Sequence, residues 1–253
     1  MAPKTRSRVA RIARRIAKTL AILGAVLVLL AALAYKNVIP GGPELVDTAE
    51  VLRNVFRQRA FALEARSAPE GTVVFIGSSS VAAFPLTVYF PGKPVLNRGL
   101  TTETARELAD RIAETLPSAR PAGVVLWTGM NDLRSEAQPP AIVAERIARV
   151  LDAIEARHPG VPVAVIELPA LCDLPPDSVA RLRETNRLLA ETAAAKRATL
   201  VSLSRPPITT AEGKLSVGLA NPDRKHLSFA GYGVLARWLL AEGGPATAPL
   251  APD

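Results

Sequence analysis

The chain has 253 residues, of which 49% are hydrophobic, so it can form one substantial core but is short for two full-sized domains. Its formal charge of +8 is typical of nucleic-acid-binding proteins, but seven basic residues lie within the first 18 positions, where no acidic residue occurs. The rest of the chain is close to neutral, which argues against nucleic-acid binding by the folded part. Cys172 is the only cysteine, and this excludes an intramolecular disulfide.

The basic residues 1–18 run into an uncharged apolar segment at 19–35, near the short end of the length that spans a bilayer as a helix. By the positive-inside rule, the basic end stays in the cytoplasm and the rest of the chain is exported. Two outcomes compete for this segment. We expect a retained signal anchor with the folded domain on the extracytoplasmic side. The alternative is a signal peptide cleaved after the small residues at 32–34, which would give a secreted or periplasmic protein.

Proline and glycine divide the rest of the chain. Residues 36–43 are rich in both and are predicted to form a linker, followed by a folded domain at 44–243. An apolar stripe at three- and four-residue spacing, ending at Leu63, predicts an amphipathic helix over 44–66. The composition of residues 244–253, mostly proline, alanine and glycine, predicts a disordered tail.

Alternating strand and helix patterns predict the fold class of the domain. Five short apolar runs rich in β-branched or aromatic residues indicate buried strands, at 72–77, 94–99, 123–129, 162–168 and 199–204. Helical patterns occur between the later runs and after the last, at 102–116, 140–157, 177–197 and 228–242. This order predicts a three-layer α/β/α sandwich around a five-stranded parallel sheet. Ligands of such sheets bind beyond the carboxyl ends of the strands.

Three consecutive serines, at 78–80, follow the first predicted strand and Gly77. A tight turn there would lift one serine side chain above the sheet edge, although a turn also needs small residues for steric reasons alone. A serine hydroxyl becomes a good nucleophile only when a base takes its proton. The two histidines of the chain are the candidates for this base. His158 ends a predicted helix before a proline and is expected to be solvated, so His226 is the stronger candidate.

The surroundings of His226 strengthen this interpretation. Asp223 precedes it by three residues, and in a compact turn the carboxylate can accept a hydrogen bond from the ring Nδ1, which leaves Nε2 free to face a serine. An aspartate capping the last helix would have the same spacing. At the end of the third predicted strand, Asn131 can donate to the oxygen of a tetrahedral intermediate, with Gly129 allowing close approach. An ordinary turn would also contain these residues, but the joint placement of all the motifs favours a serine hydrolase site.

In the order of these motifs, residues 72–240 resemble the SGNH (GDSL-type) hydrolases, which are serine esterases and acylhydrolases on a flavodoxin-like α/β sandwich. The first family block, Gly-Asp-Ser, corresponds to Gly77, Ser78 and Ser79, with Ser78 in the place of the aspartate. This correspondence implies that Ser79 is the nucleophile. It also implies that the Ser79 backbone N–H contributes to the oxyanion hole.

The later family blocks match in different degrees. The third block, Gly-x-Asn-Asp, is present unchanged as Gly129, Asn131 and Asp132, and the last block, Asp-x-x-His, corresponds to Asp223 and His226.

The second block, which usually reads Asn-x-Gly-x-x-Gly, departs from the family pattern. Here Asn97 and Gly99 are retained and Thr102 replaces the later glycine. The resemblance therefore implies Thr102 as an oxyanion donor through its N–H, with Gly99 as the alternative if the loop is shifted.

Together, the motifs and the resemblance imply hydrolysis of a small-molecule, lipid or glycan ester by Ser79, Asp223 and His226, without a metal or organic cofactor. Acyl or O-acetyl transfer to an envelope glycan is the nearest alternative, and a non-catalytic envelope binding module is the alternative from another class. Membrane contact is expected through residues 19–35. Substrate size depends on the loops at 81–93 and 169–177, and neither it nor the oligomeric state can be read from the sequence.

Overall fold

The computed structural model describes residue 26 and residues 42–252 of the chain. The expected basic N-terminus at 1–18 lies outside these residues, as does the expected membrane segment at 19–35 apart from Val26. Within the described part of the chain, no helix combines the length and the apolar character needed to cross a membrane.

The first long helix, α2 (Gly42–Glu64), begins inside the stretch that was expected to be a linker at 36–43. Internal contacts divide the chain into two units, residues 1–56 and 57–253, and the second contains the whole sheet. The helix predicted at 44–66 is therefore present, with its C-terminal turns in the second unit.

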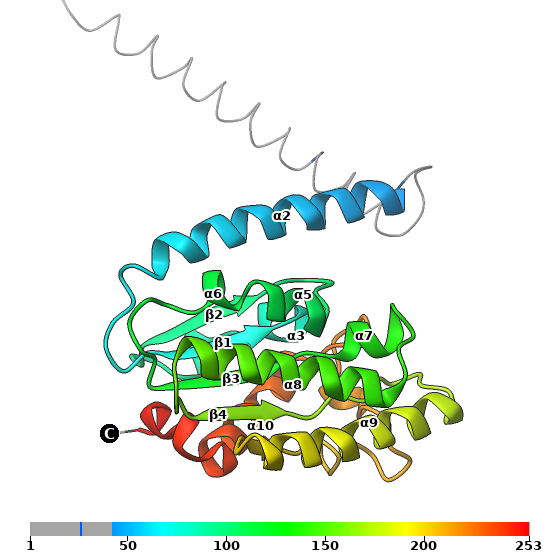
Figure 1. Ribbon diagram of the computed structural model, residues 1–253. Coiled ribbons are helices and arrows are strands. Elements are labelled where there is room, and N and C mark those ends of the chain that lie inside the picture. The colour runs from blue at the N-terminus through cyan, green and yellow to red at the C-terminus, as the bar shows by residue number, and fades with distance from the viewer. Residues whose placement is uncertain (1–25, 27–41, 253) are drawn as a thin grey trace, which may run out of the picture. The chain divides into compact units, whose positions relative to one another are not determined.

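Five parallel strands form the centre of the second unit, as predicted: β1 (Val73–Gly77), β2 (Val95–Gly99), β3 (Gly123–Trp127), β4 (Val163–Ile166) and β5 (Thr199–Val201). Their order in the sheet is β2-β1-β3-β4-β5 (Figure 1). Every residue of β1 and β3 is buried. Strands covered on both faces need apolar side chains on both, which explains their continuous apolar runs.

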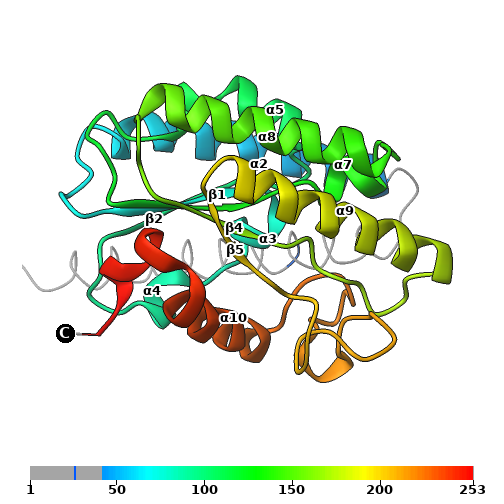
Figure 2. The same cartoon turned by 60° about the horizontal axis from the view of Figure 1, so that its bottom comes forward.

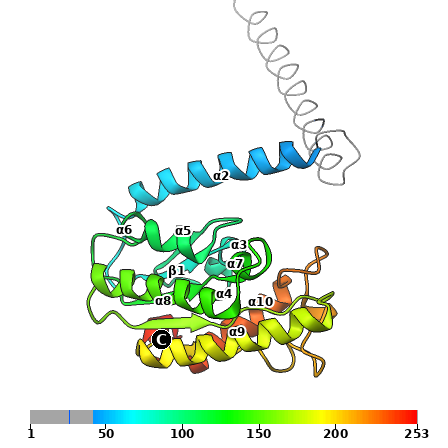
Figure 3. The ribbon, with the colours of Figure 1, turned by 45° about the vertical axis from the view of Figure 1, so that its right-hand side comes forward.

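Helices cover both faces of this sheet (Figure 2). On one side lie α5 (Ala105–Asp110), α6 (Ile112–Thr115), α8 (Pro140–Arg157) and α9 (Pro176–Ala195). On the other side lie α4 (Leu86–Tyr89) and α10 (Phe229–Glu242). The helices α8 and α9 run alongside each other (Figure 3). Two short helices, α3 (Ser79–Ala82) and α7 (Met130–Arg134), follow the carboxyl ends of β1 and β3. The predicted three-layer sandwich is confirmed.

The apolar stripe expected on α2 does not coincide with its packed face in the second unit. Leu63 is exposed, whereas Phe61 is buried. The guanidinium groups of Arg98 and Arg111 lie over the Phe61 ring, 4.6 and 5.9 Å from its centroid. A guanidinium is attracted to the face of an aromatic ring, so this turn of α2 packs through an aromatic–arginine contact that apolar periodicity does not reveal.

The C-terminal segment is ordered, so the prediction of a disordered tail at 244–253 is wrong for the described residues. Two 3₁₀ turns, Gly244–Ala246 and Ala248–Leu250, occupy it. Ala246 and Leu250 are buried, and a Cβ at Gly123 would lie only 2.0 Å from the Ala246 carbonyl oxygen. The tail therefore packs against the start of β3. Burial of its few apolar side chains holds it there, although its composition is typical of a loop.

His158 was expected to be solvated, but its ring is buried at the C-terminal end of α8. Because the Pro117 carbonyl oxygen can only accept, the ring Nε2 donates to it, at 2.9 Å. Burial lowers the pKa of this imidazole below its ordinary value, and the bond to Pro117 opposes the shift only in part. His158 is thus a neutral core histidine.

This burial makes the stability of the domain depend on His158 at mildly acidic pH. Because the pKa is lower in the folded state, the unfolded state binds more protons as pH falls below about 6.5, and the free energy of unfolding falls with it. His158→Gln should lower stability at pH 8 by about 1–3 kcal/mol, the cost of disturbing a buried hydrogen bond. The variant should also show a smaller decline in the free energy of unfolding between pH 7.5 and 5.5, as measured by urea denaturation. An equally steep decline in the parent and the variant would contradict this assignment.

Candidate active site

Ser79 lies at the carboxyl edge of the sheet because of the residues that precede it. β1 ends at Gly77, which has φ +146°, and a Cβ there would lie 1.9 Å from the Trp127 carbonyl oxygen, so only glycine fits. Ser79 then opens α3. Its side chain is partly exposed, whereas Ser78 and Ser80 are only 4% and 8% exposed. Of the three serines, Ser79 is the one most accessible to a substrate.

The structure brings Ser79, His226 and Asp223 into one hydrogen-bonded chain. The Ser79 Oγ lies 2.8 Å from His226 Nε2, across 147 positions of sequence. On the other side of the ring, Nδ1 lies 2.5 Å from Asp223 Oδ2. A carboxylate oxygen accepts, so Nδ1 carries the proton and the Nε2 lone pair faces the serine hydroxyl. In this tautomer the imidazole can accept a proton from Ser79.

The turn at 223–226 fixes the carboxylate of Asp223. Its Oδ1 accepts from the backbone N–H groups of Lys225 and His226, at 2.9 and 3.0 Å. Burial alone would raise the pKa of Asp223, but the hydrogen bonds from the His226 ring and from the two N–H groups outweigh it and lower the pKa. The carboxylate therefore stays ionised at neutral pH. The side chains of His226 and Asp223 remain 27% and 26% exposed, so water reaches the site.

Contacts of Arg224 and of Tyr232 hold this turn and the helix after it against the rest of the domain. The Arg224 guanidinium donates to both carboxylate oxygens of Asp173, at 2.5 and 2.8 Å, and the Arg224 carbonyl oxygen accepts from the Cys172 N–H at 3.1 Å. From α10, the Tyr232 hydroxyl donates to the Ser80 carbonyl oxygen at 2.7 Å, which ties the helix after His226 to the helix that carries the serine. None of these contacts was predicted from the sequence.

The end of β2 and the loop after it contain the two candidates for the second oxyanion donor, and these two residues differ in their surroundings. The Gly99 N–H donates to Asn97 Oδ1 at 3.0 Å, and a Cβ at Gly99 would lie 2.2 Å from the Ala82 nitrogen. Gly99 therefore serves close packing of β2 against α3, and its N–H is already bonded. Thr102 is exposed and has φ +63°, a left-handed conformation that the usual glycine would adopt without strain. No backbone bond from its N–H is present in the described part of the chain.

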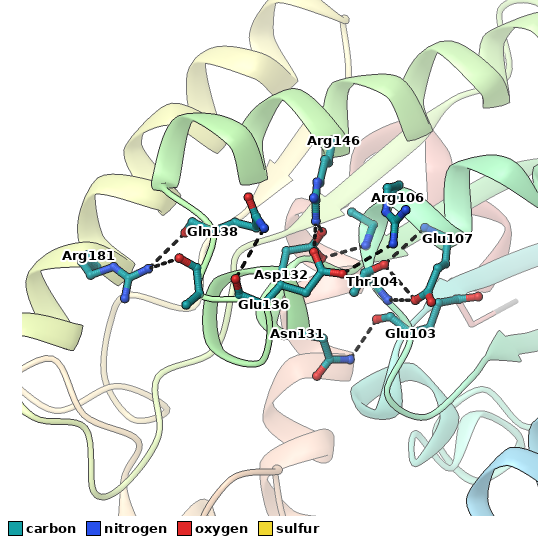
Figure 4. Close-up of polar contacts among 12 residues, drawn as sticks. Glu103, Thr104, Arg106, Glu107, Asn131, Asp132, Glu136, Gln138, Arg146 and Arg181 are labelled. Atoms are coloured by element: carbon teal, nitrogen blue, oxygen red, sulfur yellow. Dashed lines mark hydrogen bonds and ion pairs between the residues drawn. The ribbon is translucent and has the colours of Figure 1, made fainter.

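Asn131 and Asp132 have separate functions at the end of β3. One N–H of the Asn131 amide donates to the Glu103 carbonyl oxygen at 2.8 Å, which leaves its other N–H for an oxyanion (Figure 4). Asp132 is fully buried and accepts from the Ala105 N–H at 2.7 Å and from Arg146 at 2.9 Å. Asp132 thus joins α7, α8 and the start of α5. Asn131 and Asp132 together position the loop that carries Thr102.

Glu103, next to Thr102, is a supporting residue that the sequence did not reveal. Its buried carboxylate forms an ion pair with Arg111, which also donates to the Arg98 carbonyl oxygen at 3.2 Å. Burial raises the pKa of Glu103, and the Arg111 guanidinium opposes that shift. The only sequence signal was a charged residue within a threonine-rich loop, which ordinarily indicates solvent exposure.

No group of three or more histidine, cysteine, aspartate or glutamate side chains is arranged for metal binding in the part of the chain that the structure describes.

Gly129, at φ +112°, lets β3 turn into α7 beneath Ile147 and Val143.

Comparison with known proteins agrees with this geometry. The model of the GDSL-like lipase/acylhydrolase family matches residues 77–234. No curated protein sequence matches the chain. Among solved structures, the chain is similar to a candidate platelet activating factor from Streptococcus pneumonia, with a TM-score of 0.71 and 20% identity over 80% of this chain and 98% of that one.

Two further solved structures have the same fold. A GDSL-like lipase from Bacteroides thetaiotaomicron gives a TM-score of 0.63 at 19% identity and covers 73% of this chain and 95% of its own. An acetyl xylan esterase from Geobacillus stearothermophilus gives 0.52 at 20% identity, with coverage of 69% and 94%. The family match spans more than half of the sequence, and the chain therefore belongs to the GDSL-like lipase/acylhydrolase (SGNH) family of esterases and acylhydrolases.

Proposed function

We propose that this protein hydrolyses carboxylic esters with Ser79 as nucleophile, His226 as general base and acid, and Asp223 as the group that orients the imidazole. The observation that supports this proposal is the pair of hydrogen bonds at His226, 2.8 Å to the Ser79 Oγ and 2.5 Å to Asp223 Oδ2. Family membership supports the reaction class, and these contacts support the role that we propose for each residue.

In the first half of the reaction, the Ser79 Oγ attacks the acyl carbon while its proton moves to His226 Nε2. The negative charge that develops on the carbonyl oxygen is bound by the backbone N–H groups of Ser79 and Thr102 and by the free N–H of Asn131. Donors of this kind contribute about 3–4 kcal/mol to stabilising the transition state. The intermediate then expels the alcohol, which takes the proton from His226 and leaves an acyl-serine.

In the second half, water attacks the acyl-serine as His226 accepts its proton, and the acid and free Ser79 are released. The partial exposure of His226 and Asp223 supports hydrolysis over acyl transfer, because a transferase has to keep water away from its acyl-enzyme.

We also propose that residues 19–35 anchor the protein in a membrane, with the basic residues 1–18 in the cytoplasm and the hydrolase domain on the other side. The charge pattern of the sequence supports this topology. An anchored domain would meet ester substrates at the cell envelope, either lipids or acylated glycans.

A chain-length series tests the proposed activity on the full chain in membranes. The protein should release 4-nitrophenol from the acetate, butyrate or octanoate ester. With an added glycan acceptor, it should still give only free acid. The activity should sediment with membranes and withstand a high-salt wash. Failure of the folded protein to cleave any ester would contradict hydrolysis, an acylated acceptor would indicate a transferase, and activity in the soluble fraction would contradict the anchor.

A further inference from the structure

A cavity of about 300 Å³ lies beside the proposed catalytic residues, between α7, the loop after β4 and the start of α9. One end is formed by Met130, the neighbour of Asn131. Another part is formed by Asp173, which is bonded to Arg224 in the turn that carries His226. The cavity therefore adjoins α7, which carries Asn131, and the turn that carries His226. Part of an ester bound at Ser79 would lie between these two elements.

Six of the ten residues that line this cavity are apolar, and two arginines, an aspartate and a serine make the rest of its surface polar. Four buried leucines contribute to it, Leu133, Leu171, Leu174 and Leu182. Its volume is at the lower end of the range for ligand pockets, about 300–1,000 Å³. This size and mixed lining suit a small segment that carries both an apolar part and a polar group.

The charged residues of the cavity are not balanced. Asp173 is neutralised by two hydrogen bonds from Arg224, at 2.5 and 2.8 Å. Arg181 donates only to backbone carbonyl oxygens of α7 and of the segment between α7 and α8, including that of Gln138 at 3.0 Å (Figure 4). Carbonyl groups fix the position of this guanidinium but do not cancel its positive charge.

Arg134 is the second arginine of the lining, and its side chain is exposed. No hydrogen bond or ion pair joins it to another residue within the described part of the chain. The two acidic residues nearest along the chain, Asp132 and Glu136, are both already paired with Arg146, and Glu136 is also paired with Arg106. Arg181, held by backbone carbonyl groups, and Arg134, which is free within the described residues, thus border a cavity in which the one lining carboxylate, Asp173, is already paired.

We propose that this cavity binds an anionic group of the ester substrate, such as a carboxylate or phosphate, joined to the ester by a short apolar segment, with Arg134 as its partner. This proposal rests on ester hydrolysis at Ser79 and specifies the substrate class. Arginine suits this role because its planar guanidinium binds carboxylate and phosphate groups through two parallel hydrogen bonds. Neutral esters can still react, but without this contact.

Two matched ester pairs test the proposal on the full chain. The first pair places the charge on the acyl side: the mono-4-nitrophenyl ester of adipic acid against its methyl ester. The second places it on the alcohol side: 4-acetoxybenzoate against its methyl ester. For at least one pair, Arg134→Gln should lower the ratio of kcat/KM for the anionic to the neutral ester about tenfold, mainly through KM. The pair that responds identifies which side of the ester enters the cavity.

Arg149→Gln is the matched control, since it removes an equal charge from an exposed arginine of α8 that is paired with Glu145. It should leave both ratios unchanged. Higher salt should reduce the preference of the parent for the anionic ester and have less effect on Arg134→Gln. Hydrolysis of every ester with the same ratios in the parent and Arg134→Gln would overturn the anion site and leave the proposed activity intact.

If the esters are hydrolysed too slowly for their kcat/KM values to be compared, a binding measurement tests the anion site separately from ester hydrolysis. Monomethyl adipate should raise the Tm of the Ser79→Ala protein, which cannot turn over, and the shift should be lost when Arg134→Gln is added. If the Tm of the double variant rose with the concentration of monomethyl adipate as it does for Ser79→Ala alone, the anion site would be overturned. This outcome does not depend on whether the parent hydrolyses esters.

Discussion

Replacing Ser79 by alanine should lower kcat/KM for 4-nitrophenyl esters by about 10⁴-fold or more, because the variant has no nucleophile in contact with the base. Of the three neighbouring serines, Ser79 is the one whose Oγ lies 2.8 Å from His226 Nε2. Its side chain is partly exposed and makes no other hydrogen bond within the described residues, so the fold should be unaffected. Steady-state kinetics, with circular dichroism as a check on folding, measures the loss.

Ser78→Ala and Ser80→Ala are the matched controls and should each keep at least about a tenth of the activity, since neither side chain contacts His226. A fluorophosphonate, which labels an activated serine, should modify Ser79 in the parent and in both control variants. If Ser80→Ala were inactive while Ser79→Ala kept its activity, the alignment of the first family block would be wrong by one residue.

The sequence was sufficient to predict the sheet and the positions of the main motifs. Runs such as Val73–Gly77 are apolar along their whole length because helices cover both faces of the sheet, and this pattern is readable without tertiary contacts. The carboxyl ends of parallel strands share one edge, so Ser79 and Asn131 could be expected to lie near each other. The turn from Asp223 to His226 is local, which is why its geometry also followed from spacing.

Features that depend on packing between distant segments could not be predicted. Gly99 is needed because β2 packs closely against α3, where a Cβ would lie 2.2 Å from the Ala82 nitrogen. Glu103 is charged, and charge normally indicates exposure, yet Arg111 from the next helix balances it in the interior. His158 became a core residue because the Pro117 carbonyl oxygen, 41 positions away, lies beside its ring.

Asp223→Asn should lower kcat by about 10⁴-fold with little change in KM, because it places the imidazole in the wrong tautomer. The asparagine oxygen can still accept from the N–H groups of Lys225 and His226, which now bind Oδ1. Its NH₂ group then takes the place of Oδ2 and points at Nδ1, which must become the acceptor. The ring proton moves to Nε2, where no lone pair remains to take the proton of Ser79.

The size of this effect distinguishes an orienting carboxylate from one that only stabilises the turn before α10. If Asp223 served only the turn, asparagine would replace it nearly without loss, since it caps helices about as well. Asp177→Asn, the same change at an exposed aspartate in the first turn of α9, should leave kcat unchanged. The pKa of Asp223 is lowered from the ordinary aspartate value of 3.8, so its carboxylate is still mostly ionised at pH 3.8. Loss of parent activity at pH 5 would therefore not come from protonation of Asp223. A kcat for Asp223→Asn within tenfold of the parent would mean that His226 accepts the serine proton without an orienting carboxylate.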